Sequence, residues 1–280
     1  MHAYLSILYI ALSVLLLAQP RAGVCAIGSG DLLLNENFNQ TLNESIWSFD
    51  LGDGCDQGLC QWGNGEQQVY TRANVEANAN GNLRIVARYE GGKWTSGRIS
   101  TKGKFTFKYG RVDVRAKLPT ADGMFPAIWM MPQHSTYGTW PDSGEIDIAE
   151  YQSAWTKDKR VSLQSLHFKK QHGGSAMSFN TKCDPSDWHI YTVMWSPDFI
   201  KFMRDNIYIG SYIRPKDATP ASWPYNQEFY LILNLAVEPE WGSRARPEGD
   251  VHAMEVDWIR VNERLDASAL FCHYPNCPLL

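Results

Sequence analysis

Hydrophobic and polar residues alternate in short runs along most of this chain, and such alternation is typical of β-strands. Within Gly110–Leu118 (GRVDVRAKL) the apolar residues at 112, 114, 116 and 118 share one face, and the charged residues at 111, 113, 115 and 117 share the other. This pattern predicts an antiparallel strand that buries one side only. Leu83–Ala87 and Lys104–Phe107 alternate in the same way and predict two further strands.

Turn-forming residues separate the predicted strands of the second half. Ile190–Trp195 and Ile200–Met203 flank the sequence SPD, and Ile207–Ile213 follows the sequence DN, so we expect two consecutive hairpins. Phe229–Val237 (FYLILNLAV) is an apolar run that predicts a strand buried on both faces, and Val256–Val261 predicts the last strand.

The chain shows no internal repeat, low-complexity tract or linker. Many short strands in one unbroken stretch indicate an all-β domain. We expect an antiparallel two-sheet β-sandwich of the jelly-roll type, with a concave face that forms a substrate cleft.

The segment Trp140–Tyr151 (WPDSGEIDIAEY) places three carboxyl groups close together. Side chains alternate along a strand, so Glu145 and Asp147 should point the same way and the isoleucines beside them the other way. Glu150 lies an odd number of residues from Glu145 and would point away from this face. A β-bulge at Ile148-Ala149 would add one residue and return Glu150 to the acidic face. Either a bulge is present or Glu150 is turned away.

Three carboxylates on one strand face repel each other, and a structural protein gains nothing from this arrangement. Hydrolysis of a glycosidic bond needs two carboxyl groups across the bond, one ionised and one protonated, and crowding separates their pKa values. At a separation of about 5–5.5 Å, the mechanism is retaining. Glu145 would then attack the anomeric carbon, Glu150 would act as acid and base, and Asp147 would adjust the charge of Glu145. The same triplet is compatible with a solvated strand face or with a calcium site of oxygen ligands.

Composition narrows the range of substrates. The formal net charge is −4 and the sequence pI is about 6.0, which argues against nucleic-acid binding and against attraction to anionic membranes. The chain contains 11 Trp and 13 Tyr. We expect most of them in the core, and some in a cleft that binds a neutral sugar polymer through flat aromatic faces.

The N-terminus has the features of an export signal. Ile7–Leu17 (ILYIALSVLLL) is an apolar run too short for a membrane span, and polar residues and a proline follow it. We expect residues 1–25 to form a signal peptide, with cleavage between about Ala22 and Ala26, and residues 26–280 to form a single secreted domain without membrane attachment. An uncleaved membrane anchor is the alternative.

Six cysteines fit an oxidising compartment. Cys55 with Cys60, and Cys272 with Cys277, lie close enough in sequence for local disulfides, which leaves Cys25 and Cys183. The sequence alone leaves the connectivity open.

The catalytic segment Gly144–Tyr151 (GEIDIAEY) resembles the active-site strand of glycoside hydrolase family 16. The extra residue before Glu150 is typical of the laminarinase branch, the endo-β-1,3-glucanases, whereas the lichenase branch has one residue fewer there. The resemblance extends over nearly all of the predicted mature chain, through the segments Trp62–Thr71, Ser96–Thr101, Tyr109–Ala116, Phe125–Pro132, Leu166–Phe168, Phe229–Val237 and Glu255–Trp258. It implies a curved jelly roll with an open cleft, a retaining mechanism and no organic cofactor.

The resemblance also implies roles for individual residues. Glu145 would be the nucleophile, Asp147 its helper and Glu150 the acid/base. The residues that would line the cleft are Asn64, Arg98, Trp129, Trp140, His167 and Trp241. Trp140 and Trp241 are the best candidates for stacking, because the C–H face of a sugar is apolar and packs on an indole. Core packing is the alternative for any one tryptophan, and Arg98 and His167 have the alternative of a structural role.

Members of the family bind calcium on the convex side, and the carbonyl groups of Asn37 and Gly81 with the carboxylate of Asp257 match those positions. The resemblance therefore implies a structural calcium ion, with a strand-edge role for Asp257 as the alternative.

Three segments depart from the family pattern and leave the sugar subsites open. Cys55–Cys60 resembles an insertion that would narrow one end of the cleft. Lys169–Gly174 is basic instead of neutral and glycine-rich, which would suit a modified or branched glucan. Val237–Trp241 carries two acidic residues in place of glycines.

We expect a secreted monomer that cleaves internal β-1,3 bonds of laminarin-type glucans. The alternatives are a non-catalytic β-glucan recognition protein, a transglycosylase, and the same chemistry on a mixed-linkage glucan or a galactan. Recognition proteins of this type typically lose the catalytic glutamates, and Glu145 and Glu150 are both present here.

Overall fold

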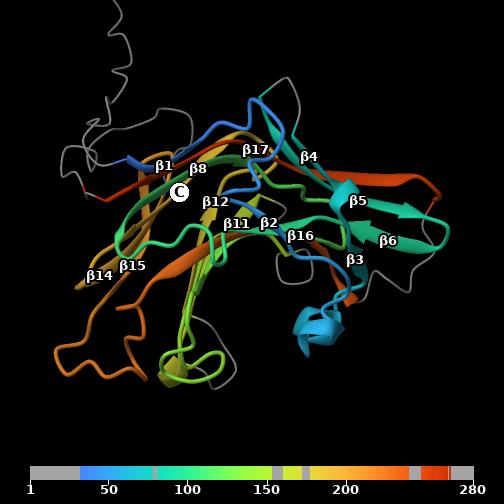
Figure 1. Ribbon diagram of the computed structural model, residues 1–280. Helices are drawn as coiled ribbons and strands as arrows, with labels where there is room; N and C mark the ends of the chain where they lie inside the picture. The colour runs from blue at the N-terminus through green and yellow to red at the C-terminus, as the bar shows by residue number, and fades with distance from the viewer. Residues whose placement is uncertain are drawn as a thin grey trace, which may run out of the picture.

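The structure is a computed structural model that describes residues 32–77, 81–152, 160–171, 177–239, 247–263 and 265. These residues form strands β1 to β17 and four short 3₁₀ segments, η1 to η4. The strands assemble into a ten-stranded and a seven-stranded sheet, which lie one above the other in Figure 1. The predicted two-sheet β-sandwich is confirmed. The predicted signal peptide lies outside the described residues.

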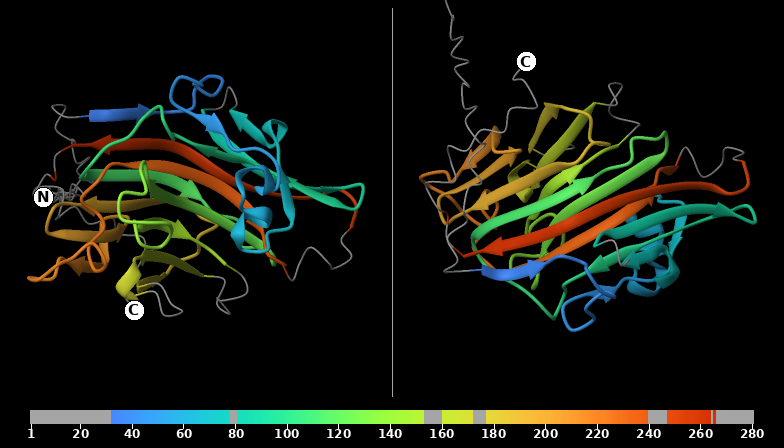
Figure 2. Two further views of the ribbon diagram at one scale, coloured as in Figure 1. Left: turned by 60° about the horizontal axis from the view of Figure 1, so that its bottom comes forward. Right: turned by 90° about the horizontal axis from the view of Figure 1, so that it is seen from above.

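The ten-stranded sheet has the order β15-β14-β13-β8-β17-β5-β6-β3, with β1 paired to β17 and β4 paired to β5. Its long central strands run side by side in Figure 2. The pairing is antiparallel except between β3 and β6. The strands are β1 (Leu32–Glu36), β3 (Gln68–Tyr70), β4 (Val75–Ala77), β5 (Leu83–Glu90), β6 (Lys93–Ser96), β8 (Gly110–Lys117), β13 (His189–Trp195), β14 (Phe199–Arg204), β15 (Ile207–Ile213) and β17 (Asp250–Asn262).

The seven-stranded sheet has the order β12-β11-β10-β9-β16-β7-β2, and its pairing is antiparallel throughout. It contains the catalytic segment as the interior strand β10, which lies between β11 and β9. The strands are β2 (Ser48–Phe49), β7 (Arg98–Ser100), β9 (Met124–Pro132), β10 (Glu145–Glu150), β11 (Val161–His167), β12 (Met177–Lys182) and β16 (Phe229–Val237).

Apolar side chains from both sheets meet in one core. Val112 and Val114 of β8 belong to the same buried cluster as Ile146 and Ile148 of β10. The run Phe229–Val237 is buried along its whole length, as predicted, because β16 lies between β9 and β7. The isoleucines of the catalytic strand therefore anchor it in the sandwich, and its carboxylates face the other way.

Both predicted hairpins are present. β13 and β14 pair across the SPD turn, and β14 and β15 pair across Asp205 and Asn206. Asp205 and Asn206 have positive φ angles of 51° and 62°, the left-handed geometry that a tight hairpin turn requires.

Two strand predictions need correction. Lys104–Phe107 does not form a strand: a turn begins at Thr101, whose carbonyl accepts hydrogen bonds from the amides of Lys104 and Phe105. In β8, Arg111 and Asp113 are buried although the pattern places them on a solvated face. They form an ion pair with each other at 2.7 Å in a central strand, where neighbouring strands cover them.

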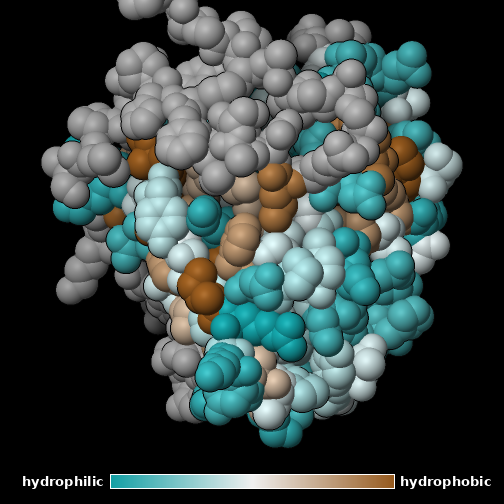
Figure 3. All heavy atoms as spheres, turned by 90° about the vertical axis from the view of Figure 1, so that its left-hand side faces the viewer, coloured by the Kyte–Doolittle hydropathy of each residue, from teal (hydrophilic) through white to brown (hydrophobic). Residues whose placement is uncertain are grey.

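The molecular face that carries β14 and β15 shows apolar side chains as small separate groups among hydrophilic ones (Figure 3). Ile213, on the edge strand β15, is 62% exposed. Single exposed apolar residues of this kind are normal for a soluble surface. No helix formed by the described residues is long and apolar enough to cross a bilayer.

Candidate active site

Strand β10 contains the predicted β-bulge. Asp147 lies opposite Trp129 of β9 and opposite Ser165 of β11, but the register has shifted by Glu150 on both sides of the strand. Ser165, the cross-strand partner of Asp147, lowers the pKa of Glu150, which indicates that the Glu150 side chain reaches the face of Asp147. Glu150 has returned to the acidic face, and the prediction is confirmed.

The start of β10 is fixed by Gly144. This residue has a φ angle of 86°, and a Cβ atom on it would lie 2.8 Å from Cγ of Pro224. Only glycine fits this geometry without strain. Because Gly144 precedes Glu145, it sets the direction in which the first carboxylate leaves the strand.

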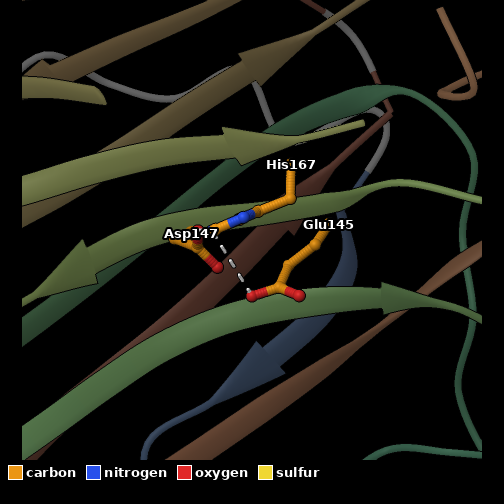
Figure 4. A group of neighbouring side chains, drawn as sticks. All are labelled: Glu145, Asp147 and His167. Atoms are coloured by element: carbon orange, nitrogen blue, oxygen red, sulfur yellow. Dashed lines mark ion pairs between the residues drawn. The ribbon is translucent and has the colours of Figure 1, made fainter. Parts of the chain in front are cut away.

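Glu145, Asp147 and His167 form a compact group (Figure 4). His167 is the cross-strand partner of Glu145 on β11. Its Nε2 atom lies 3.2 Å from Oδ2 of Asp147 and 3.9 Å from Oε1 of Glu145. His167, which was predicted to line the cleft, thus lies beside the catalytic carboxylates. Within the described part of the chain, these three residues are also the group of acidic and histidine side chains spaced closely enough to hold a metal ion.

Trp140 covers the same group from the loop before β10. Its indole Nε1 donates a hydrogen bond of 2.5 Å to Oε2 of Glu145. Its ring lies 5.7 Å from the ring of His167, and its side chain is 49% exposed. An exposed indole beside a catalytic carboxylate is well placed to pack on a sugar ring.

Burial and charge shift the pKa values of all three carboxyl groups. Burial raises the pKa of Glu145 well above its usual range, and the charge of Asp147 raises it further, whereas His167 and Trp140 lower it. Burial raises the pKa of Asp147 to about 7, and a hydrogen bond with Glu145 opposes this shift. Burial, followed by the charges of Asp147 and Glu145, raises the pKa of Glu150 well above its usual range. The group therefore holds protons near neutral pH.

The environments of the two glutamates differ. Ionised Glu145 is favoured by the Trp140 indole and by the His167 imidazole. Among the influences on Glu150, the hydrogen bond from Ser165 alone favours ionisation. Both pKa values are raised, but Glu145 has two neighbours that favour its anion and Glu150 has one, a difference in the direction that glycosidic bond cleavage requires.

A second group of predicted residues surrounds Trp129. Arg98 of β7 lies over the ring of Trp129 at 5.0 Å and over the ring of Trp62 at 4.3 Å. Its guanidinium is paired with Asp50 at 3.2 Å. Trp129 lies opposite Asp147, so this group continues the catalytic face toward β7.

Asn64 reaches the same group through buried polar residues. It donates a hydrogen bond of 3.2 Å to Glu66, and Tyr70 donates one of 3.1 Å to the same carboxylate. Asn234 of β16 donates to Tyr70 at 3.2 Å and accepts from the indole of Trp129 at 2.7 Å.

Five residues of this group had no role predicted from the sequence: Asp50, Trp62, Glu66, Tyr70 and Asn234. Asn234 did carry a signal, because it is the one amide within the apolar run of β16. Glu66 lies in the family-like segment Trp62–Thr71, but its burial could not be read from the sequence. Trp241 lies outside the described residues, as do residues 172–174 of the basic stretch.

The loop that departs from the family pattern is closed by a disulfide between Cys55 and Cys60, as predicted. It contains η1 (Cys55–Gln57) and continues into η2 (Cys60–Gly63). In Figure 1 this loop and η4 (Lys169–Gln171) project from the same side of the molecule. Cys183 is also disulfide-bonded, and Cys25, Cys272 and Cys277 lie outside the described residues.

The side chains at the predicted calcium positions already have cationic partners. Asp257 is ion-paired with Arg115, and Oδ1 of Asn37 accepts a hydrogen bond from Arg260. Calcium takes six to eight oxygen ligands, and Arg115 opposes a second cation at Asp257, the one predicted ligand that is a side chain. In this arrangement the Asp257 carboxylate does not fit a calcium ion, and the calcium site stays a prediction.

Two glutamates brought to one face of a β-strand by a bulge, with more neighbours that stabilise the anion around Glu145 than around Glu150, are the arrangement that a glycoside hydrolase needs. The family model described as glycosyl hydrolases family 16 matches residues 60–260 of the chain. The protein belongs to this family, and the resemblance found in the sequence is confirmed.

Individual relatives agree with this assignment. A "Beta-glucanase" from Rhodothermus marinus is 37% identical over 235 residues, which cover 77% of this chain and 78% of the relative. The crystal structure of a laminarinase from Flavobacterium sp. UMI-01 superposes with a TM-score of 0.73 at 39% identity, covering 82% of this chain and 99% of that one. The catalytic domain of an endo-1,3-beta-glucanase (laminarinase) from Thermotoga petrophila superposes with a TM-score of 0.74 at 31% identity, covering 84% of this chain and 98% of that one.

Proposed function

We propose that the protein is a retaining endo-β-1,3-glucanase that cleaves internal bonds of laminarin-type glucans. The observation that carries the proposal is the bulge in β10, which brings Glu150 to the face of Glu145. The names of the solved relatives, laminarinase and endo-1,3-beta-glucanase, support the choice of substrate.

The proposed reaction has two steps. In the first, the Glu145 carboxylate attacks the anomeric carbon while the Glu150 carboxylic acid gives its proton to the leaving glycosidic oxygen. This forms a covalent glycosyl ester on Glu145. In the second step, the Glu150 carboxylate takes a proton from water, and the resulting nucleophile attacks the same carbon and releases Glu145. Two inversions return the β configuration.

The neighbours of Glu145 support its role as nucleophile. The Trp140 indole donates to one carboxylate oxygen, and His167 lies on the side of the other. The charge of Asp147 raises the pKa of Glu145, so Asp147 influences the pH at which the nucleophile becomes ionised.

The sugar chain would run across the sheet between two aromatic regions. Trp140 offers an exposed ring beside the catalytic group, and Trp129 with Arg98 continues the surface toward β7. Asn64 is exposed near the disulfide loop, where the insertion would limit the length of glucan that fits. The neutral surface of a glucan suits aromatic packing with a few hydrogen bonds.

A recognition protein without activity is less well supported. Such a protein needs the aromatic surface but not two glutamates with raised pKa values held together by a bulge. A transglycosylase uses the same first step, and the acceptor in the second step separates it from a hydrolase.

The test is an assay of new reducing ends on laminarin. The wild type should release them rapidly. Glu145→Ala should lose roughly 10³-fold or more of the activity because it lacks the nucleophile. Glu150→Ala should lose roughly 10²–10⁴-fold, the usual contribution of an acid/base group.

The matched control is Glu44→Ala, which removes an exposed glutamate paired with Arg72 and should keep wild-type activity. Laminarin binding without release of reducing ends by the wild type would favour a recognition protein. Activity on mixed-linkage glucan or galactan, without activity on laminarin, would show that the enzyme acts on that polymer instead. Longer products than the starting chains would indicate transglycosylation.

We also propose that the protein is secreted and acts as a monomer. The apolar run at residues 7–17 and the disulfide between Cys55 and Cys60 support export to an oxidising compartment. Expression of the full chain in a secretory host, followed by N-terminal sequencing of the medium fraction, should show cleavage between Ala22 and Ala26. Light scattering of the same sample should give the mass of one chain, and a mass of two chains would contradict the monomer.

A further inference from the structure

Glu66 is a buried carboxylate that the proposed reaction does not use. It lies between η2 and β3 and is 5% exposed. Burial raises its pKa, which means that the anion costs free energy in this place unless the surroundings stabilise it. A carboxylate retained at such a position calls for an explanation in terms of its contacts.

Three hydrogen-bond donors converge on Glu66. The amide of Asn64 donates to Oε1 at 3.2 Å. The amide of Gln68 and the hydroxyl of Tyr70 donate to Oε2 at 2.7 and 3.1 Å. The charge of Arg98 acts in the same direction. These contacts favour the carboxylate, because an ionised carboxyl group can only accept hydrogen bonds.

The hydroxyl of Tyr70 extends the network toward the catalytic strand. It accepts a hydrogen bond from Nδ2 of Asn234 at 3.2 Å, and Oδ1 of Asn234 accepts one from the indole of Trp129 at 2.7 Å. Trp129 lies opposite Asp147 in the pairing of β9 and β10. A continuous chain of hydrogen bonds thus joins Glu66 to the neighbour of the catalytic group.

Every hydrogen bond from Trp129 to Glu66 runs in the same direction, with the donor on the side of Trp129 and the acceptor on the side of Glu66. An indole can only donate, so Asn234 must turn its oxygen to Trp129 and its amino group to Tyr70. The hydroxyl of Tyr70, which accepts from Asn234, then donates its own proton in a hydrogen bond to Glu66. An acceptor without protons at the end of the chain fixes the orientation of each group along it.

We propose that Glu66 is a positioning residue for glucan binding, which fixes Trp129 through Tyr70 and Asn234 and fixes Asn64 directly. This inference rests on the proposed function. Both ends of the network are surfaces that a sugar can reach, since Trp129 is half-buried under Arg98 and Asn64 is exposed. Glu66 itself is covered and acts through these residues.

Replacement of Glu66 by glutamine tests the charge with little change in shape. The new amide offers one acceptor oxygen and places its NH₂ group against a donor. Gln68 cannot turn its own amide to compensate, because its Oε1 accepts the backbone N–H of Val237 at 2.7 Å. Tyr70 cannot accept from the new amide and keep its bond from Asn234 in the same geometry.

The experiment compares Glu66→Gln, Tyr70→Phe and wild type on laminarin. Tyr70→Phe keeps the ring that packs on Trp62 at 5.3 Å and removes only the hydroxyl that links Asn234 to Glu66. We expect both variants to raise KM about tenfold, with kcat changed by less than about threefold. A tenfold change is near the low end of the free-energy cost of leaving a buried polar group without its hydrogen-bond partner. In the inactive Glu145→Ala background, calorimetric Kd for a laminarin oligosaccharide should rise by the same factor.

The control is Glu76→Gln on β4, a half-buried glutamate paired with Arg84 and Arg88 outside this network, for which KM should stay at the wild-type value. A purely structural role of Glu66 would lower the melting temperature or the active fraction and leave KM and Kd unchanged, and that result overturns the inference. If Glu66→Gln does not fold, an unchanged KM in Tyr70→Phe overturns it equally. Failure of the wild type on laminarin would instead refute the proposed function.

Discussion

At the scale of single residues, the site separates two chemically identical glutamates by their surroundings. Both are raised in pKa by burial and by the charge of Asp147. Glu145 alone has an indole N–H and an imidazole as neighbours. The difference in function therefore arises from Trp140 and His167 and not from the glutamates themselves.

Asp147→Asn tests the electrostatic part of this account. The charge of Asp147 raises the pKa of Glu145, which must be ionised, and of Glu150, which must be protonated. Removal of the charge lowers both pKa values, so both limbs of the pH–rate profile should move to lower pH. The measurement is kcat/KM for laminarin across pH, with Asp142→Asn as control, because Asp142 is paired with Lys169 at the surface. An alkaline limb that stays in place would show that Asp147 does not set the pKa of Glu150.

At the scale of elements, strand β10 has to present three carboxylates on one face while its apolar residues anchor it in the core. Ile146, Ile148 and Ala149 are fully buried. Glu150 lies an odd number of positions after Glu145, which would place the two on opposite faces of a regular strand. The bulge accommodates one additional residue and brings both to the same face.

Deletion of Ala149 should therefore be tolerated. The shortened sequence EIDIE alternates regularly, so all three acidic residues keep their face and both isoleucines keep the core without a bulge. We expect a folded protein with measurable glucanase activity, assayed by circular dichroism and by release of reducing ends. A folded but inactive deletion variant would show that the bulge itself, and not the face of Glu150, is required.

Gly144→Ala should destabilise the same strand. A left-handed conformation costs a non-glycine residue about 1–2 kcal/mol, and the new Cβ would also meet Pro224 at 2.8 Å and Tyr225 at 3.0 Å. We expect a lower free energy of unfolding in urea and a loss of kcat/KM. The control is Gly91→Ala, which has a positive φ of 58° but no neighbour within 4 Å, and which should carry the conformational cost alone. Equal losses in both variants would contradict a steric role for Gly144.

Strands and hairpins were predictable where alternation and turn residues agree, as in β8, β13, β14 and β15. The bulge was predictable from the odd sequence offset between Glu145 and Glu150 alone. Lys104–Phe107 alternates but lacks a partner strand beyond the single bridge of Phe107 to Phe229, and no local pattern reveals that. The network of Glu66 could not be derived, because Asn234 and Tyr70 are far apart in sequence and meet only when β16 and β3 pack.

At the scale of the whole molecule, the ten-stranded sheet supports the seven-stranded sheet that carries the site. Arg115 binds the carboxylate of Asp257, the one side-chain group that the family resemblance assigns to calcium, so an ion pair within the chain occupies that ligand. We expect the thermal midpoint to be the same in calcium and in EGTA. The measurement is a melting curve of the secreted protein in each buffer, and a higher midpoint in calcium would contradict the expectation and support the predicted ion.

The central claim is that Glu145 is the nucleophile and Glu150 the acid/base of a retaining glucanase, and azide rescue tests it most directly. An aryl β-laminaribioside supplies a leaving group that needs no proton, so each variant can react with azide in place of its missing group. In Glu145→Ala, azide should enter from the vacated side and give the α-glycosyl azide. In Glu150→Ala, azide should replace water after the ester has formed on Glu145 and give the β-glycosyl azide. Interchanged products, or no rescue of either variant, would contradict the assignment of the two residues.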